Sequence, residues 1–386
     1  MVFLKDLSKR LFALNGELND SVYRILGRNQ ARHAEILSEF YEIDTISDVS
    51  VVRDFRRRIS DNNDIFYTTN ANISNSSIYG IWESLFPGTD RSELYKTPAV
   101  EHGLIFSEDI FTDLRYTARA SSITFGDYRK KIIRRYKDTP TFCVGPYILY
   151  AQSYYNEEKL SQLKAELGKT LLVFPAHSTD ASQVSQNDIE FVEKIKREAA
   201  RFDSVLVNSF WWNINDPLVR MLESEGFRIV TAGFRDDLRF LSRLRSIIAL
   251  SDVAVGDSVG THIGYTLSLG VPFKFLDTST IVEVSDAREG AHQAAVEERK
   301  NLLRTAFAAV SGEDVNSQIE ICEPYWGFSH VKTREQLQII LDITKQIVAR
   351  GNGWVSRYGT CARDLISDYE AEGKWESAKM LREAMA

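Results

Sequence analysis

Apolar and polar residues follow a regular rhythm along the second half of the chain. Short, continuous apolar runs are typical of strands that are buried on both faces of a parallel sheet, and amphipathic stretches between them predict helices. The pattern predicts strands over 170–174, 204–209, 227–230, 252–255 and 272–276, and helices over 187–200, 216–226, 237–250 and 261–269. Strands that alternate with helices pair in parallel, so this half should form a doubly wound sheet that binds ligands beyond the carboxyl ends of its strands.

Two of these helices carry more detailed expectations. The helix over 216–226 begins with Asp216 and Pro217, which are a favoured cap and a favoured first-turn residue. The helix over 187–200 should turn one apolar face inward, made by Ile189, Val192, Ile195 and Ala199.

The first half of the chain has a less regular pattern. Residues 1–60 are predicted to be helical, because leucines recur there at helical spacing: Leu4, Leu7, Leu11 and Leu14. Apolar runs then predict strands over 64–69, 99–106, 122–125 and 141–149. A helix over 156–167 should end this half near Gly168, and two last helices, over 360–372 and 374–385, are expected to pack back on it.

Together these elements predict an α/β protein of two Rossmann-like domains facing a cleft, with N-terminal and C-terminal helical extensions. A chain of 386 residues is too long for one ordinary core and suits two domains. The predicted parts are a helical segment over 1–60, a first domain over 61–168, a second domain over 169–350 and C-terminal helices over 351–386.

Charge and apolar content narrow the class of partner. The formal net charge of -7 argues against duplex nucleic acid, because its binding proteins usually carry a basic excess. No apolar run approaches the roughly 18 residues of a membrane span, and the N-terminus lacks a signal-peptide core. A cytoplasmic protein is expected, with association at the inner face of the membrane left open.

Cys143, Cys322 and Cys361 lack the spacing of a metal site and fit a reducing compartment.

The segment that follows the predicted strand over 252–255 is the strongest candidate binding site. Gly256 and Gly260 let the backbone turn tightly, and the helix after them offers N–H groups and a favourable dipole to a phosphate. Ser258 and Thr261 can add hydroxyl donors, and His262 can add a donor or a positive charge. The alternative is a plain turn whose serine and threonine only cap the helix. The chain has neither a Walker loop nor a GxGxxG fingerprint after the first strand of this half.

Two further loops hold candidate residues. His177 and Ser178 follow the first strand of the second half and should lie at the same sheet edge, although an ordinary polar loop explains them equally well. In the first half, Glu101-His102-Gly103 can place a general base at a tight backbone position, because imidazole titrates near neutrality. A structural histidine is the more common alternative.

Basic and aromatic groups give weaker signals. Asp127 is expected to cap a basic helix whose cations most simply form a solvated face, with attraction of an anionic acceptor as the alternative. These cations are Arg129, Lys130, Arg134 and Arg135. Three tryptophans near predicted strand ends either pack in the core or stack on bases and sugars. They are Trp211, Trp212 and Trp326. Glu320 and Glu323 flank a strand that is predicted before Trp326, and their carboxylates would accept hydrogen bonds from ribose hydroxyls.

The order of these segments resembles the GT-B glycosyltransferase superfamily, and most closely its bacterial capsule and teichoic-acid-type transferases, including the CDP-glycerol glycerophosphotransferase group. The matching segments are His102-Gly103, Gly126-Asp127-Tyr128, Phe174-Pro175-Ala176-His177, and Ser251-Asp252 followed by Asp257-Ser258. The doubled serine common in that group is replaced here by Ser258-Val259. Weaker likenesses link the chain to UDP-N-acetylglucosamine 2-epimerases and to sialyl- or Kdo-type CMP-sugar transferases.

The resemblance implies a metal-independent glycosyltransferase that moves a sugar or polyol phosphate from a nucleotide-activated donor to a hydroxyl of a saccharide or glycolipid acceptor. Domain 61–168 would hold the acceptor and domain 169–350 the donor, with no cofactor or metal. The catalytic residues would be His102 as base, Glu101 and Asp127. The donor would be bound by His177, Ser178, Asp257, Ser258, Gly260, Thr261, His262 and Glu323. The alternatives are an isomerase resembling nucleotide-sugar 2-epimerases and a catalytically inactive GT-B-like binding subunit.

Overall fold

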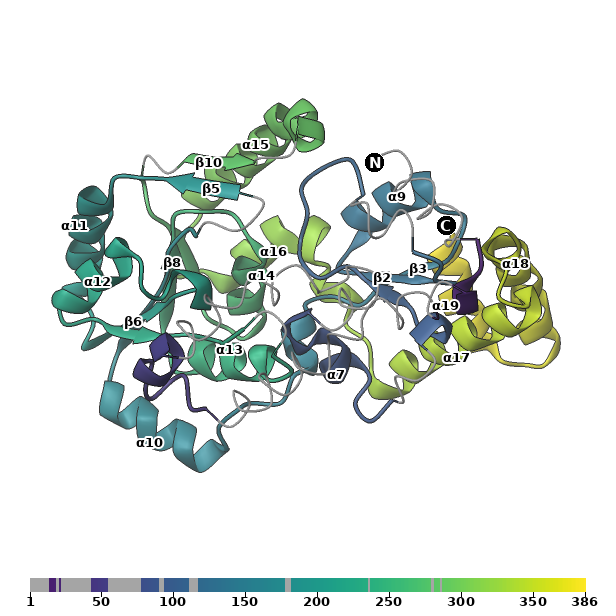
Figure 1. Cartoon of the computed structure of the whole chain (residues 1–386), viewed down its shortest axis with the longest axis horizontal. Helices are drawn as coiled ribbons and strands as arrows, with labels where there is room; N and C mark the ends of the chain where they lie inside the picture. The colour runs from purple at the N-terminus through teal and green to yellow at the C-terminus, as the bar shows by residue number, and fades with distance from the viewer. Residues whose placement is uncertain are drawn as a thin grey trace. The chain divides into compact units, whose positions relative to one another are not determined.

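The computed structural model describes residues 14–18, 21, 43–54, 78–89, 94–110, 117–177, 182–234, 237–278, 281–284 and 287–386. It is a mixed α/β structure in which helices accompany parallel strands (Figure 1). The chain divides into two units. Unit 1 comprises 1–35, 64–147 and 323–386, and unit 2 comprises 36–63 and 148–322. In the part of the chain described, no helix is both long and apolar enough to cross a bilayer.

Unit 2 contains a five-stranded parallel sheet with the strand order β7-β6-β4-β8-β9. The strands are β4 (Thr170–Phe174), β6 (Ser204–Asn208), β7 (Arg228–Val230), β8 (Val253–Gly256) and β9 (Phe273–Phe275). The helices between them are α11 (Asp188–Ala199), α12 (Pro217–Ser224), α13 (Phe240–Ala249) and α14 (Thr261–Ser268), and α10 (Glu157–Leu167) precedes β4. The predicted alternation of strands and helices in this half is confirmed.

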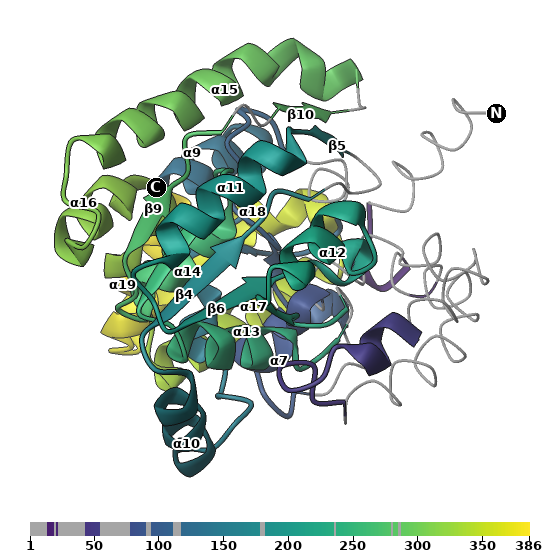
Figure 2. The same ribbon diagram turned by 90° about the vertical axis from the view of Figure 1, so that its left-hand side faces the viewer.

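One face of this sheet packs against α11 and α12, which lie in front of β4 and β6 in Figure 2. Leu171 and Val173 of β4 join Phe191 and Ile195 of α11 in one buried cluster, to which α12 adds Leu222. Side chains alternate across a strand, so the strand residues between these face the other side of the sheet and are buried there as well. Burial on both faces explains why β4 has no polar residue after Thr170.

Of two local predictions about helices of unit 2, one is wrong and the other is confirmed. Ile189 is 69% exposed, and Phe191 replaces it on the inward face of α11, because that face is set by the positions that meet β4 and β6. The predicted start of α12 is confirmed, since Asp216 is its N-cap and Pro217 stands in its first turn, although the Asp216 side chain makes no capping bond. Its carboxylate instead accepts a hydrogen bond from Asn213 Nδ2 at 2.5 Å.

Unit 2 also contains a separate strand pair and two later helices, the second of which continues into unit 1 at Glu323. β5 (Ser182–Ser185) and β10 (Ile281–Val284) form an antiparallel pair, followed by α15 (Ala287–Ala308) and α16 (Val315–Trp326). The strand predicted before Trp326 is therefore wrong, since the segment is helical. Gln318 of α16 is fully buried, and its amide accepts from Phe273 N–H and donates to Phe273 C=O, both at 2.9 Å. This side chain satisfies the Phe273 N–H and C=O on the open edge of β9, so α16 covers that edge.

Unit 1 contains a short parallel sheet with the order β1-β2-β3. Its strands are β1 (Ala99–Val100), β2 (Ser122–Thr124) and β3 (Thr141–Cys143), and α9 (Asp127–Tyr136) connects the last two. The strand predicted over 122–125 is confirmed, whereas those over 99–106 and 141–149 are much shorter than predicted. The strand predicted over 64–69 and the first three leucines of the N-terminal pattern lie outside the described residues. Leu14 lies in a turn and is 52% exposed.

Helices complete unit 1. They are α7 (Ile81–Leu85), α17 (Arg334–Gly351), α18 (Val355–Ala371) and α19 (Trp375–Met385). The last three pack on one another, and α19 packs on β3. Unit 1 also contains the short 3-10 helices η1 (Ile78–Gly80), η2 (Leu94–Lys96) and η5 (Phe328–His330), whereas η4 (Trp211–Asn213) belongs to unit 2 and η3 (Tyr147–Tyr150) begins at the last residue of unit 1 before the chain enters unit 2. Arg134 of α9 donates to Met385 C=O at 2.7 Å, which ties the end of the chain to unit 1.

Candidate functional site

The strand order of unit 2 creates a switch point between β4 and β8. The chain leaves β4 toward β6 on one side of the sheet and leaves β8 toward β9 on the other, so the loops after these two strands diverge. Phe174 pairs with Gly256 at the carboxyl ends of the two strands. Open α/β sheets bind ligands at this position, because the diverging loops leave a crevice. Both loops that the sequence singled out, at His177 and at Ser258, begin here.

Asp257 joins the two loops to each other. Its side chain is 1% exposed, and Oδ1 accepts a hydrogen bond from Ala176 N–H at 2.8 Å. Its backbone carbonyl accepts from the guanidinium of Arg304, which comes from α15. The Asp257 carboxylate thus positions the loop after β4.

His262 is packed against aromatic rings. Its ring stacks on Phe174 with centroids 4.8 Å apart, and Phe273 lies 5.4 Å away on another side. Burial, with the charge of His177 as a smaller cause, lowers the pKa of His262 to about 3, so the ring is neutral at pH 7. Nε2 is buried and has no hydrogen-bond partner in the part of the chain described. Of the two predicted roles, the lowered pKa favours a neutral donor over a positive charge at neutral pH.

The positive charge at this turn comes from Arg304, which the sequence pattern did not reveal. Ser258, Gly260 and Thr261 are all partly exposed at the N-terminus of α14, and Gly260 is its N-cap without a side-chain capping bond. The guanidinium of Arg304 lies beside them through its bond to Asp257 and stacks 4.8 Å from the Phe275 ring. A helix N-terminus with an adjacent guanidinium suits a phosphate.

A cavity of about 330 Å³ lies at the same edge, over the ends of β4 and β6. It is lined by the loop that contains His177, by Gln186, by Phe210 and by the start of α12, whereas the turn 257–262 does not line it. His177 is exposed, and its ring stacks on Phe210 with centroids 4.7 Å apart. Asn213 Oδ1, also from the lining, is buried and lacks a hydrogen-bond partner among the described atoms. Buried acceptors are rarely left unpaired, so this atom indicates a donor supplied by a ligand or water. Ser178 lies outside the described residues.

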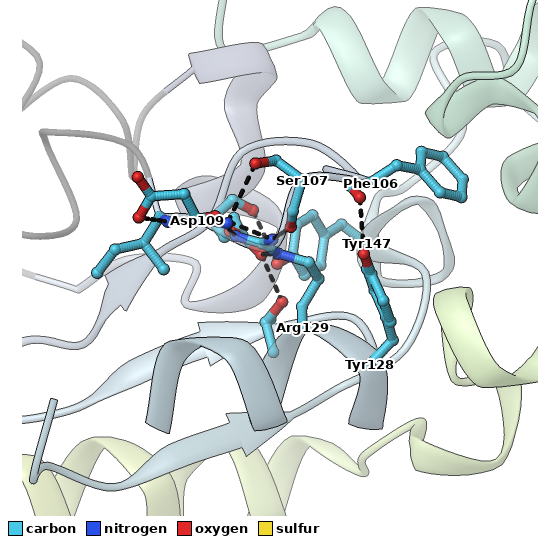
Figure 3. Close-up of polar contacts among 9 residues, drawn as sticks. Phe106, Ser107, Asp109, Tyr128, Arg129 and Tyr147 are labelled. Atoms are coloured by element: carbon cyan, nitrogen blue, oxygen red, sulfur yellow. Dashed lines mark hydrogen bonds and ion pairs between the residues drawn. The ribbon is translucent and has the colours of Figure 1, made fainter. Parts of the chain in front are cut away.

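In unit 1, Glu101 is part of a buried ion pair rather than an exposed loop group. Arg129 Nη2 donates to Glu101 Oε1 at 2.6 Å, and Thr124 Oγ1 donates to Oε2 at 2.7 Å. Figure 3 shows Arg129 reaching the backbone carbonyls of Ser107 and Asp109 as well. The prediction that Arg129 belongs to a solvated face is wrong, since it is fully buried. The arrangement fixes the segment that contains His102.

His102 itself is partly exposed. Its ring centroid lies 6.4 Å from that of Tyr79, a residue with a positive φ of 61°. A tyrosine in this backbone region is uncommon and is typical of binding or catalytic loops as well as of tight turns. Part of the His102 side chain is accessible from outside the protein.

Asp127 and Glu323 have local partners within unit 1. The N-cap of α9 is Gly126, so the prediction that Asp127 caps this helix is wrong. Asp127 stands in the first turn of α9, and its Oδ2 lies 3.3 Å from His330 Nε2. Glu323, at the end of α16, accepts from the backbone and hydroxyl of Ser329. It belongs to unit 1 and not to the unit that contains the turn at Ser258.

Cys143 and two of the three candidate tryptophans are buried. Trp211 and Trp326 are 4% and 0% exposed, which favours core packing over stacking on a ligand, while Trp212 is partly exposed. Cys143 lies near Asp127 and His330, and burial raises the pKa of its thiol to about 12. It is therefore no thiolate nucleophile at neutral pH.

Comparisons with known proteins identify no family for this chain. A scan against protein-family models found no family that matches the chain, and a search of curated proteins found no match either.

Proposed function

We propose that the chain is a glycosyltransferase that uses a nucleotide-activated donor, with the donor bound at the carboxyl edge of the unit 2 sheet. The observation that carries this proposal is the cavity of about 330 Å³ beside the β4–β8 switch point. Its size and place suit a nucleoside, because ligand pockets of α/β sheets of this kind have such volumes and lie at such edges.

The two parts of the edge would divide the donor between them. Phe210 and His177 offer aromatic faces to a base, and Asn213 offers an unpaired acceptor to a ribose hydroxyl. The N-terminus of α14 and Arg304 would hold the phosphates. Ala176 connects the two parts, because it lines the cavity and its N–H binds Asp257.

Charge develops on the leaving phosphate as the sugar or polyol phosphate departs. Backbone N–H groups of the α14 start and the guanidinium of Arg304 are fixed before the reaction, so they stabilise that charge without reorganising. In unit 1, His102 would accept the proton of the acceptor hydroxyl. Glu101 would act on His102 only by holding the backbone, because its carboxylate is bound to Arg129.

A transfer assay tests the proposal. The protein is incubated with CMP-, CDP-, UDP- and GDP-linked donors, with and without saccharide and glycolipid acceptors, and the products are identified by mass spectrometry. The proposal predicts nucleotide release and a new glycoside or phosphodiester only when an acceptor is present. Conversion of a donor without acceptor would instead identify an isomerase, and binding without turnover would identify a non-catalytic subunit.

A further inference from the structure

Three different metal-ligating side chains meet at one place in unit 1. Asp127 comes from the first turn of α9, Cys143 from the end of β3 and His330 from the end of η5. One ligand atom of each lies within 4.8 Å of the other two. The sequence separation between Cys143 and His330 hides this cluster from any motif search, and only the fold brings the three together.

The backbone beneath the cluster is fixed by contacts among three glycines. A Cβ on Gly126 would lie 3.0 Å from Gly327 N, and one on Gly145 would lie 2.8 Å from Gly327 O. A Cβ on Gly327 would lie 2.6 Å from Phe125 O. Gly126 directly precedes Asp127, Gly145 is two residues after Cys143, and Gly327 is three residues before His330. The three segments are therefore held against one another before any ligand binds, as a specific metal site requires.

Space and access are present beside these side chains. A cavity of about 40 Å³ is lined by Cys143 and His330, together with Lys130, Lys332 and Glu383. This volume exceeds the roughly 10–15 Å³ that a water-sized occupant needs. The side chains of Asp127 and His330 are 48% and 29% exposed, so an ion reaches the buried sulfur from their side.

The donor set favours a borderline transition metal over a hard cation. A thiolate, an imidazole and one carboxylate suit Zn²⁺, whereas Mg²⁺ and Ca²⁺ require oxygen ligands. Lys130 lies beside the cluster with its ammonium 3.3 Å from Asp127 Oδ1, so a bound ion has to displace this ion pair from the carboxylate.

We propose that Asp127, Cys143 and His330 form a Zn²⁺ site with three protein ligands and a fourth position open to water. Binding replaces the hydrogen bond between His330 and Asp127, forms the Cys143 Sγ–Zn²⁺ bond and releases the thiol proton to solvent. Two anionic ligands then balance the charge of the ion. Three ligands with an open fourth position are the arrangement of zinc sites that polarise a bound molecule. The site belongs to unit 1 alone and does not depend on nucleotide binding by unit 2.

Metal titrations of the full chain, reduced and stripped with chelator, test the site. Co²⁺ reports on sulfur ligation through a thiolate-to-cobalt charge-transfer band, and Zn²⁺ affinity is measured by competition with a chromophoric chelator. One equivalent of Co²⁺ should produce the band in the wild type and in Cys361→Ser, whose thiol lies on α18 outside the cluster. Cys143→Ser should lose the band, and His330→Gln should weaken Zn²⁺ binding by about tenfold or more.

Two results would overturn the proposal. One is the absence of the band from the wild type at one equivalent of Co²⁺. The other is a band that persists in Cys143→Ser and disappears in Cys361→Ser, which would place the metal on another thiol. If Cys143→Ser fails to fold, His330→Gln still tests the site, because His330 is partly exposed and its replacement leaves the buried sulfur in place. A Zn²⁺ affinity equal to that of the wild type in His330→Gln would also contradict the site.

Discussion

Arg129 holds the carboxylate of Glu101 with three hydrogen bonds in the interior of unit 1. Nη2 donates to Oε1 at 2.6 Å, and Nε lies 3.1 Å from both carboxylate oxygens. The same guanidinium donates to the Ser107 carbonyl at 2.6 Å, so it connects β1 with the loop that follows (Figure 3). Glu101 therefore acts as an anchor of the backbone on both sides of His102.

Replacing Arg129 should be strongly destabilising. Arg129→Met leaves the buried carboxylate of Glu101 without its counter-ion, and the loss of one partner of a buried pair lowers the free energy of unfolding by about 3–5 kcal/mol. Arg135→Met on the same helix is the control, because Arg135 is 61% exposed and should contribute less than about 1 kcal/mol. Urea denaturation of both variants measures the difference. Equal losses would show that the pair does not stabilise unit 1.

The imidazole of His262, whose Nε2 is buried, should make stability depend on pH. The unfolded chain binds a proton at this side chain below a pKa of 6.5, whereas the folded chain does so only near pH 3. The stabilisation is thus complete above pH 6.5 and falls as the pH decreases toward 3, by up to about 1.4 kcal/mol per pH unit. His262→Phe keeps an aromatic ring and removes the titration. Chemical denaturation of both proteins between pH 7 and 4 should give a smaller decrease for the variant; parallel curves would mean that His262 is solvated in the folded state.

Gly327 should tolerate no side chain. Its φ is +61°, and a Cβ would lie 2.6 Å from Phe125 O, whereas Gly373 has a φ of +74° with no atom within 4 Å of a Cβ. Both alanine variants strain the backbone by about 1 kcal/mol. Gly327→Ala should lose at least about 2 kcal/mol more than Gly373→Ala in urea denaturation, because it also separates the segments at Asp127 and His330. Similar losses would contradict the close approach of the three glycines.

His102 should matter for transfer and not for donor binding. If it accepts the proton of the acceptor hydroxyl, His102→Ala lowers the transfer rate by about 100-fold or more. Nucleotide affinity should stay at the wild-type value, because the proposed donor site is built from unit 2 and His102 belongs to unit 1. Steady-state rates and calorimetric nucleotide titrations separate the two effects. A transfer rate within a few-fold of the wild-type rate would show that His102 is not the general base.

The strands of unit 2 were predictable because burial on both faces leaves a continuous apolar run, as in β4 from Leu171 to Phe174. The helical segment α16 was not, since its buried Gln318 is polar and is placed there to bind the Phe273 backbone of β9. A tertiary hydrogen bond of this kind leaves no periodic signal in the sequence. The strands of unit 1 were predicted too long because the apolar runs continue past their ends. Tyr147, for example, is apolar because it packs in the core, although it lies in a 3-10 helix and not in the sheet.

The candidate site was predictable only in its position. Glycine and serine after β8 indicate a turn at a sheet edge, and the strand order of unit 2 puts that turn at a switch point. Arg304 could not be inferred, because it approaches Asp257 from a helix far along the chain. Of the two roles predicted for His262, a donor or a positive charge, the loss of solvation beside Phe174 favours the neutral donor. Partners that meet through tertiary packing are invisible to local patterns.

Nucleotide binding by unit 2 is the central claim, and a titration of CMP, CDP, UDP and GDP followed by thermal unfolding tests it most directly. One diphosphate should stabilise the wild type by about 2.7 kcal/mol at a hundredfold excess over its Kd. Arg304→Gln should reduce that stabilisation, and Arg299→Gln, on the same helix with its bond to Ala295, should not. Unchanged unfolding with all four nucleotides at millimolar concentration would contradict the account.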